Sequence, residues 1–380
     1  PADPPPDSGS DPADPPPADS PPADPPPADP PPADPPPADP PPADPPPADP
    51  PPADPPPADP PPADPPPADP PPADPPPADP PPADPPADPP DPAADPADPF
   101  TGMGVVQPVA TGLKFTEGPV WLASEGALLF TDLEGDQVWR YDPGVGTTLV
   151  RDVAQRFTNG MTLDQSGRRI ECQHTTQQVV RIEADGSETV LASAWNGTTL
   201  NSPNDVVIGG DGTLYFTDPT IGKYAHLGNV QTMPLGFRGV YRIDPQGQLH
   251  LVDDTLADPT GVALSPAGDV LYVADWGTGW IHRYPVLADG SLGAREAFSD
   301  WAAQPDGMCV DVQGNVYVAS NSGLRVLRPD GSNWGLLALP HSPMSNCAFG
   351  GADWSTLYLT DVSAVYAVSV AIPGAPPFGG

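Results

Sequence analysis

The feature that most constrains the fold is an internal repeat of about 45 residues that begins near Phe100. Each unit has a Gly-containing turn, an apolar strand, a short break, a second strand and a closing turn, as in "GALLFTDLEGDQVWRYDPG" and "GDVLYVADWGTGWIHRYPVLADG". The strands end at equivalent positions, which we assign to Asp132, His174, Asp218, Asp275, Ser320 and Asp361. Six units without helical periodicity predict an all-β, six-bladed β-propeller over residues 100–380, with four strands per blade.

The spacing between the repeats also predicts an insertion. The intervals are 42, 44, 57, 45 and 41 residues, so the third is the longest. The extra residues fall within "TIGKYAHLGNVQTMPLGF", Thr220 to Phe237, which we expect to form a loop over one face of the propeller.

A second short strand precedes each apolar strand, and it begins with a polar phrase. The phrases are "EGPVWL", "NGMTLD", "NDVVIG", "TGVALS", "DGMCVD" and "NCAFGG". Because the innermost strand of every blade lines the central channel, their first residues should form a ring of side-chain oxygens at one channel mouth. The ring predicted in this way consists of Glu117, Asn159, Asn204, Thr260, Asp306 and Asn346.

Two interpretations of this ring are open. Asn, Asp and Thr followed by Gly are ordinary turn residues, and a wet channel tolerates them. Glu117 and Asp306, however, are two carboxylates that we expect to face each other across a narrow tunnel, where they must share a proton or hold a cation. Oxygen ligands of this kind favour Ca²⁺, with Mg²⁺, Mn²⁺ or Zn²⁺ as other divalent cations.

Residues 1–99 have a different composition and are predicted to be a disordered, extended tail. They contain only Pro, Ala, Asp, Ser and Gly, mostly as a repeated PADPP pentad, and 22 of them are Asp. Such a sequence favours polyproline II and self-repulsion rather than a core. We interpret it as a spacer, which would tether the domain to the cell envelope; a weak, diffuse calcium-binding segment is the alternative.

Charge and composition also bear on partners and location. The net charge is −37, and both the tail and the remainder are acidic, which argues against nucleic acid as a partner. No apolar run is long enough to span a membrane. The chain starts at Pro1 without Met, which together with the spacer leads us to expect an extracellular or periplasmic, envelope-associated protein. Cys172, Cys309 and Cys347 are too few for a disulfide framework, and we interpret each as a small buried hydrophobe.

Residues 105–370 resemble the regucalcin/gluconolactonase family of six-bladed propellers, which includes the diisopropylfluorophosphatase type. The resemblance rests on "EGPVW", "NSPNDVV", "DGTLYFTDP", "PDGMCVD", and "NCAFGG" followed by "LYLTD", in the family's order and spacing. It implies a small-molecule lactone or ester substrate, metal ligands at Glu117, Asn204 and Asp306, and Asp306 as the base that activates water. Thr260 stands where the family usually has Asn, so Asn159 is an additional candidate ligand. Ser202 replaces an arginine of animal members.

A bound cation would act as a Lewis acid on the lactone carbonyl, while Asp306 takes a proton from water. Alternatives are Asp306 as nucleophile, a non-catalytic binding propeller with a structural ion, and a phosphotriesterase-type hydrolase, since one fold hosts several functions. Asn159, Thr260, Asn346 and Trp121 are candidate further ligands or substrate contacts.

Other polar and aromatic residues receive mostly structural interpretations. Tyr224, His226 and Trp276 are candidates for the substrate pocket, at the mouth or in the insertion. His174 is expected to be a hydrogen-bonded structural histidine, and Asp205 to point away from Asn204 and stabilise a turn.

Overall fold

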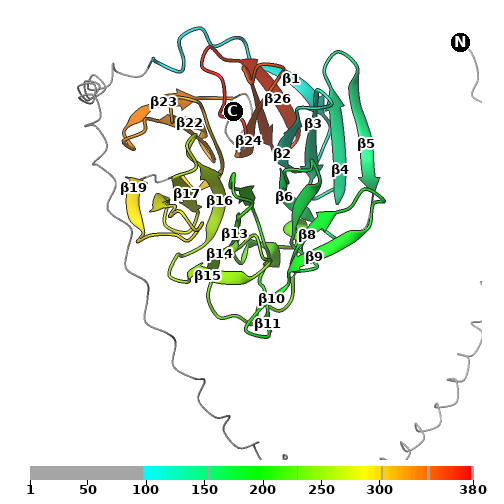
Figure 1. Cartoon of the computed structure of the whole chain (residues 1–380). Coiled ribbons are helices and arrows are strands. Elements are labelled where there is room, and N and C mark those ends of the chain that lie inside the picture. The colour runs from blue at the N-terminus through cyan, green and yellow to red at the C-terminus, as the bar shows by residue number, and fades with distance from the viewer. Residues whose placement is uncertain (1–96, 153–154, 229, 301–302, 340–342, 378–380) are drawn as a thin grey trace, which may run out of the picture. The chain divides into compact units, whose positions relative to one another are not determined.

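The structure is a computed structural model that describes residues 97–152, 155–228, 230–300, 303–339 and 343–377. Six four-stranded antiparallel sheets lie in a ring (Figure 1). Each innermost strand contacts the innermost strands of the two neighbouring sheets. The predicted six-bladed β-propeller is therefore confirmed.

We number the blades along the chain and give the strands of each from the centre to the rim. The first three blades contain β2 (Thr116–Leu122), β3 (Ala127–Asp132), β4 (Gln137–Asp142) and β5 (Gly146–Asp152); β6 (Thr158–Leu163), β7 (Arg169–Gln173), β8 (Gln178–Ile182) and β9 (Glu188–Ala192); and β12 (Val206–Ile208), β13 (Leu214–Asp218), β14 (Gly239–Ile243) and β15 (Leu249–Asp253). A small hairpin, β10 (Ala194–Trp195) and β11 (Thr198–Thr199), lies between blades two and three in the sequence.

The other three blades follow the same order. They contain β16 (Pro259–Leu264), β17 (Val270–Asp275), β18 (Trp280–Pro285) and β19 (Glu296–Asp300); β20 (Pro305–Val310), β21 (Val316–Ser320), β22 (Gly323–Leu327) and β23 (Asn333–Leu337); and β24 (Met344–Gly350), β25 (Thr356–Asp361), β26 (Ala364–Ser369) and β1 (Gln107–Thr111). Blade six thus combines strands from both ends of the propeller, with Gln107 paired to Ala367. This pairing closes the ring and leaves blade six with no missing outer strand.

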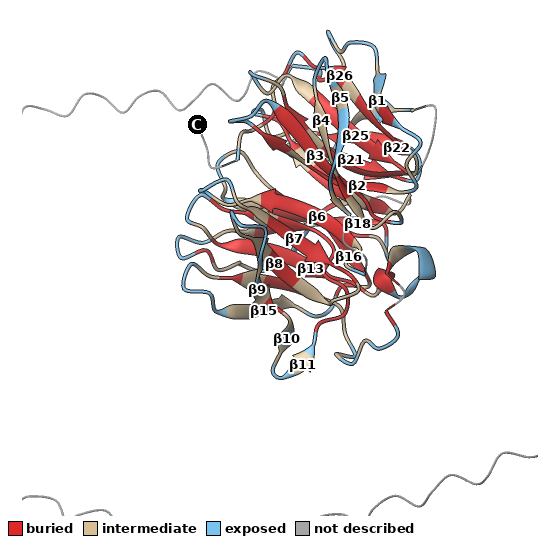
Figure 2. Cartoon of the chain, turned by 90° about the vertical axis from the view of Figure 1, so that its right-hand side faces the viewer, coloured by how far each residue is buried: buried red, intermediate tan, exposed pale blue. Residues whose placement is uncertain are grey.

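The blades are held together by apolar faces that pack sheet against sheet. The second strands of blades one, three and five are buried at every residue, because both of their faces meet a neighbouring blade (Figure 2). One cluster, for example, joins Ile170 and Cys172 of blade two to Val206 and Phe216 of blade three. The apolar runs of the repeat are therefore core strands, as their composition predicts.

The insertion predicted between Thr220 and Phe237 lies between β13 and β14. It contains two short 3₁₀ helices, η1 (Ile221–Lys223) and η2 (Ala225–Leu227). Within the described part of the chain, no helix is long and apolar enough to cross a membrane. Residues 1–96 of the predicted tail lie outside the described residues, and the boundary at residue 99 stays a prediction.

Candidate active site

The predicted ring residues lie where the inner strands begin, at irregularities of strand pairing. The register between first and second strands shifts after Glu117, Thr158, Pro259, Pro305 and Met344. Bulges of this kind bend a strand and re-aim its side chains. Consequently Glu117, Asn159, Thr260 and Asp306 fall at or within a bulge, and Asn204 lies two residues before β12.

The glycine that follows most ring residues is required by close contact between blades. A Cβ atom on Gly118 would overlap the carbonyl oxygen of Asn159, and one on Gly261 would overlap that of Asp306. A Cβ atom on Gly160 would overlap Asp205 and the Asn204 carbonyl of blade three, and one on Gly307 would overlap the Asn346 side chain of blade six. The phrases "EGP", "NGM", "TGV" and "DGM" therefore describe a channel in which successive inner strands touch.

At this glycine position, blades three and six carry polar side chains instead. Asp205 follows Asn204, and its two carboxylate oxygens accept hydrogen bonds from the backbone N–H groups of Val206 (3.0 Å) and Val262 (3.1 Å). Since Val262 belongs to blade four, Asp205 joins two blades. We expected Asp205 to stabilise only a local turn. This expectation is incomplete, because its side chain also reaches the inner strand of the neighbouring blade.

Asn346 occupies the corresponding position in blade six, one residue beyond the ring. Its amide nitrogen donates to Oε2 of Glu117 at 3.2 Å. The ring position itself is taken by Ser345, whose hydroxyl donates to the Thr116 carbonyl at 2.6 Å. Thr260 makes the same kind of bond to the Pro305 carbonyl at 3.0 Å. The prediction that Asn346 is the sixth ring member is therefore wrong by one residue, although its side chain does reach Glu117.

A comparable shift occurs in the second strand of blade two. Gln173 pairs with Thr158 as Asp132 pairs with Thr116, so Gln173 ends the strand. The assignment of His174 to this position is wrong by one residue. The turn after Gln173 instead places His174 over the ring.

His174 fixes the two ring amides. Its Nδ1 lies 2.5 Å from the Leu227 carbonyl, and because a carbonyl can only accept, Nδ1 carries the proton. Nε2 then accepts from the amide nitrogens of Asn159 at 3.2 Å and, more weakly, Asn204 at 3.5 Å. Burial lowers the pKa of His174 to about 4, so its imidazole stays neutral at neutral pH. Both amide oxygens are therefore turned away from His174 and remain available to a ligand.

The insertion supports this histidine. Leu227 of η2 supplies the carbonyl that orients it, and Gly228 accepts a hydrogen bond from Thr175 at 2.9 Å. Tyr224 and His226 lie in the same insertion, and the Tyr224 side chain is exposed. These two candidates for the substrate pocket therefore lie on the same insertion that orients His174 through the Leu227 carbonyl.

The carboxylates of the channel influence one another. Burial is the main cause that raises the pKa of Glu117 to about 8, and the charge of Asp205 adds to it, against hydrogen bonds from Gly118 and Asn346. Burial, followed by the charges of Glu117 and Asp205, raises the pKa of Asp306 well above its usual range. Burial also raises the pKa of Asp205 to about 7. All three buried acidic groups therefore favour the protonated form, and a bound cation would instead stabilise their ionised form.

The arrangement of the blades corrects one detail of the predicted geometry. Glu117 and Asp306 belong to blades one and five, which both flank blade six, rather than to blades on opposite sides of the channel. Both bonds that Glu117 accepts, from Gly118 N at 3.0 Å and from Asn346, end on Oε2. Its Oε1 is therefore available to a cation.

The donor set is made of oxygen atoms, as a hard cation requires. Carboxylates of Glu117 and Asp306 and amide oxygens of Asn204 and Asn159 suit Ca²⁺. Among the described residues, no group of three or more His, Cys, Asp or Glu side chains is placed to hold a metal ion. The predicted ligand set contains only two carboxylates, Glu117 and Asp306, so its ability to hold a cation depends on the amide oxygens of Asn159 and Asn204.

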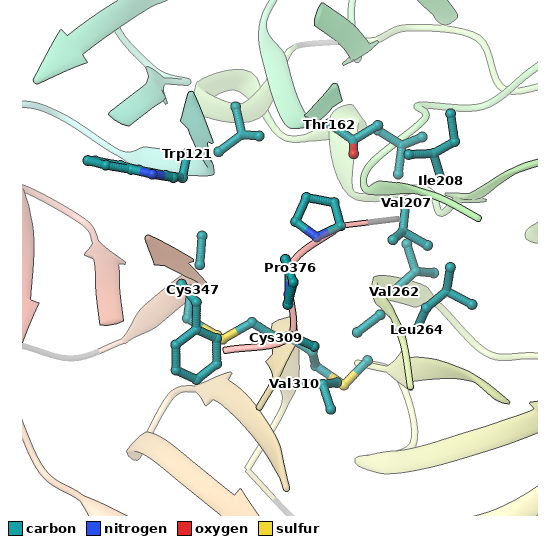
Figure 3. A pocket seen from close by; sticks show the side chains of 18 of the residues that line it. Trp121, Thr162, Val207, Ile208, Val262, Leu264, Cys309, Val310, Cys347 and Pro376 are labelled. Atoms are coloured by element: carbon teal, nitrogen blue, oxygen red, sulfur yellow. The ribbon is translucent and has the colours of Figure 1, made fainter. Parts of the chain in front are cut away.

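Beyond the ring, the channel opens into a cavity of about 290 Å³ (Figure 3). The later residues of all six inner strands line it, together with Ala375–Pro377 from the C-terminal segment. Asp205 and Asn346, which directly follow ring positions, also line this cavity. The C-terminal segment is held in place by hydrogen bonds from Gly374 N to the Trp354 carbonyl and from Ala375 N to the Val310 carbonyl.

Trp121 belongs to this cavity and not to the ring. It lies four residues after Glu117 on β2, packs against Tyr358 with ring centroids 5.6 Å apart, and is 5% exposed. Four residues of a strand span roughly 13 Å, which moves the indole away from the channel mouth. The structure therefore does not bring the predicted substrate contact Trp121 to the predicted metal ligands.

Sequence reasoning undervalued Asp205 and did not assign Ser345 or the orienting role of His174. One signal was present for Asp205, because the "ND" pair has an acid where four other phrases have Gly. The two remaining features depend on turns and bulges whose register the sequence pattern does not show.

Comparison with known proteins places these features in one family. Residues 115–363 match the SMP-30/Gluconolactonase/LRE-like region. A gluconolactonase of Zymomonas mobilis is 28% identical over 270 residues, covering 64% of this chain and 76% of the relative. Regucalcin of Xenopus laevis is also 28% identical, over 260 residues that cover 66% and 84%. The solved structure of a Xanthomonas campestris gluconolactonase superimposes with a TM-score of 0.66 at 31% identity, covering 70% of this chain and 89% of that one.

Proposed function

Because the chain belongs to the SMP-30/gluconolactonase/LRE-like family, we propose that it is a lactonase-type hydrolase that opens a sugar lactone or a related ester at the channel mouth. The lactonases among its relatives support this reaction class. The observation that carries the proposal is the juxtaposition of Glu117, Asn159, Asn204 and Asp306 at one mouth of the channel, where burial raises the pKa of both carboxyl groups.

The proposed cofactor is a divalent cation, with Ca²⁺ preferred because every donor is an oxygen. Glu117, Asn204 and Asp306 would hold it, and Asn159 offers a further amide. Thr260 is a weaker candidate, since its hydroxyl already donates to Pro305. When bound, the cation supplies Lewis-acid polarisation of the substrate carbonyl.

Asp306 is the proposed general base. In this role its carboxylate accepts a proton from the attacking water and later returns it to the leaving alkoxide oxygen. A base must be ionised, and a neighbouring positive charge would lower the pKa that burial and Glu117 raise. Glu117 is restrained by Gly118 and Asn346, which suits a ligand rather than a mobile base.

The remaining residues have two proposed roles, which are to orient the ring amides and to contact the substrate. His174 holds the Asn159 and Asn204 amides so that their oxygens stay directed away from it. The insertion that carries Tyr224 and His226 covers His174, and its exposed aromatic side chains are the proposed contacts for the substrate ring.

The test is proton release from a sugar lactone in weak buffer by the full chain, after removal of metal with a chelator and then during titration with Ca²⁺. Asp306→Asn should lower turnover by about 10²–10⁴-fold, while the variant still folds and shows a cooperative thermal unfolding transition. Asp353→Asn, in an exposed turn, is the matched control. Retained turnover in Asp306→Asn would overturn the assigned base.

The chelation arm separates the alternatives. Turnover that disappears with chelation and returns with Ca²⁺ supports a catalytic ion. If no lactone is hydrolysed but Ca²⁺ still raises the unfolding temperature, the ion is structural and a binding propeller replaces the enzyme as the best explanation. Hydrolysis of phosphotriesters but not lactones would favour the other hydrolase type on this fold.

We also propose that the acidic, proline-rich tail is a spacer of an exported protein, on the basis of its composition. Fractionation of cells that produce the natural protein tests this proposal. Recovery from the cytoplasm alone would contradict it.

A further inference from the structure

Two of the three cysteines lie together, which the sequence pattern did not predict. Cys309 is on β20 of blade five and Cys347 is on β24 of blade six, and their Sγ atoms are 2.8 Å apart. A disulfide bond measures about 2.05 Å, so less than about 1 Å of movement would close one. Cys172 is buried in blade two within a different apolar cluster.

Both cysteines lie beside the channel cavity. Cys309 and Cys347 line the cavity beyond the ring (Figure 3), and Cys309 is only partly buried. A small oxidant that enters this cavity would therefore meet Cys309 first. Cys347 is further restrained, since its sulfur lies 3.5 Å from the Tyr317 carbonyl.

We propose that Cys309 and Cys347 form a thiol oxidation site that closes to a disulfide and joins blades five and six. The oxidant is a hydroperoxide. The Cys309 thiolate attacks one peroxide oxygen, the O–O bond breaks, and an alcohol or water leaves with a sulfenic acid on Cys309. The Cys347 thiol then attacks this sulfur, the S–S bond forms, the S–O bond breaks and water leaves. Two thiols are oxidised and one hydroperoxide is reduced.

The surroundings of Cys309 set the expected speed. Burial, contact with Cys347 and the charge of Asp311 raise the pKa of the Cys309 thiol. Little thiolate is present at neutral pH, so oxidation should be slow compared with that of an exposed thiol. The site is thus a slow cross-link rather than a fast sensor.

The position of the bond gives it a structural effect. Blade six holds β1 and β26 from the two ends of the propeller, and its inner strand contacts β20 of blade five. A covalent link between these inner strands, 38 residues apart in sequence, restrains opening of the ring beside the closing blade. We therefore expect the oxidised protein to unfold at a higher temperature.

The experiment uses the full chain, reduced and then treated with hydrogen peroxide in native buffer. Free thiols are titrated after denaturation, and the cross-link is identified by mass mapping without reductant. The count should fall from three to one, and Cys309 should be linked to Cys347. The unfolding temperature should rise by on the order of 5–10 °C and return to its starting value with a dithiol reductant.

Matched variants locate the reaction. Cys172→Ala should still lose two thiols, whereas Cys309→Ala should form no intramolecular disulfide. Mapping of the unsubstituted protein decides the question even if Cys309→Ala does not fold. Three surviving thiols, a bond that involves Cys172, or sulfinic acid at Cys309 without a cross-link would each overturn the proposal. A cross-linked protein with an unchanged or lower unfolding temperature would overturn the stabilising role.

Discussion

Replacement of Asp205 tests the electrostatics of the channel directly, because this residue is 7% exposed and its carboxyl group joins blades three and four. Burial raises its pKa from 3.8 to about 7, against hydrogen bonds from Val262 and Val206 that lower it. Its folded form therefore holds a proton that its unfolded form releases between these two pH values. Stability from this group is fully present below about pH 4 and is lost as pH rises toward 7.

The size of the effect follows from the two pKa values. One pKa unit corresponds to about 1.4 kcal/mol, so the rise from 3.8 to about 7 amounts to about 4 kcal/mol of unfolding free energy. Asp205→Asn does not titrate, and it should remove this part of the pH dependence. The charge of Asp205 also raises the pKa of Glu117 and of Asp306, so its removal should flatten the profile further.

The assay is urea unfolding of metal-free protein, followed by tryptophan fluorescence between about pH 4 and pH 8. The unsubstituted protein should lose at least about 4 kcal/mol more across this range than Asp205→Asn. A lost hydrogen bond in the variant costs the same at every pH and does not change the slope. The control is Asp353→Asn, because hydrogen bonds from Ser355 lower the pKa of this exposed group and its contribution has the opposite sign. Parallel profiles for Asp205→Asn and the unsubstituted protein would refute the reasoning.

Two further predictions concern the inner strands. Thr260→Val should cost about 1–3 kcal/mol, because the Pro305 carbonyl loses its donor, while calorimetric Ca²⁺ affinity should stay within about threefold; a tenfold loss of affinity would instead make Thr260 a ligand. Gly261→Ala should destabilise by at least about 1–3 kcal/mol in urea unfolding, because the new Cβ would overlap the Asp306 carbonyl. Gly210→Ala, in open space, is its control, and equal stabilities would contradict this packing argument.

The sequence by itself determined the architecture and predicted the polar ring that we propose as the site. A repeat of about 45 residues predicts six blades, since each unit supplies one sheet that cannot bury its faces alone. The polar phrases predict a ring, because each begins an inner strand, and the Gly that follows Glu117 or Asp306 is explained by the contact between strands. Even the insertion is readable as a long interval between repeats.

Only the tertiary structure decided how neighbouring blades meet. Three contacts join residues of different blades. They are the hydrogen bond from Val262 N to Asp205, the hydrogen bond from Ser345, which takes the ring position predicted for Asn346, to the Thr116 carbonyl, and the contact between Cys309 and Cys347. Such contacts depend on bulges, where one extra residue reverses the direction of a side chain. The local sequence does not show which residue is the extra one in a bulge. Packing between blades therefore sets the register of each inner strand.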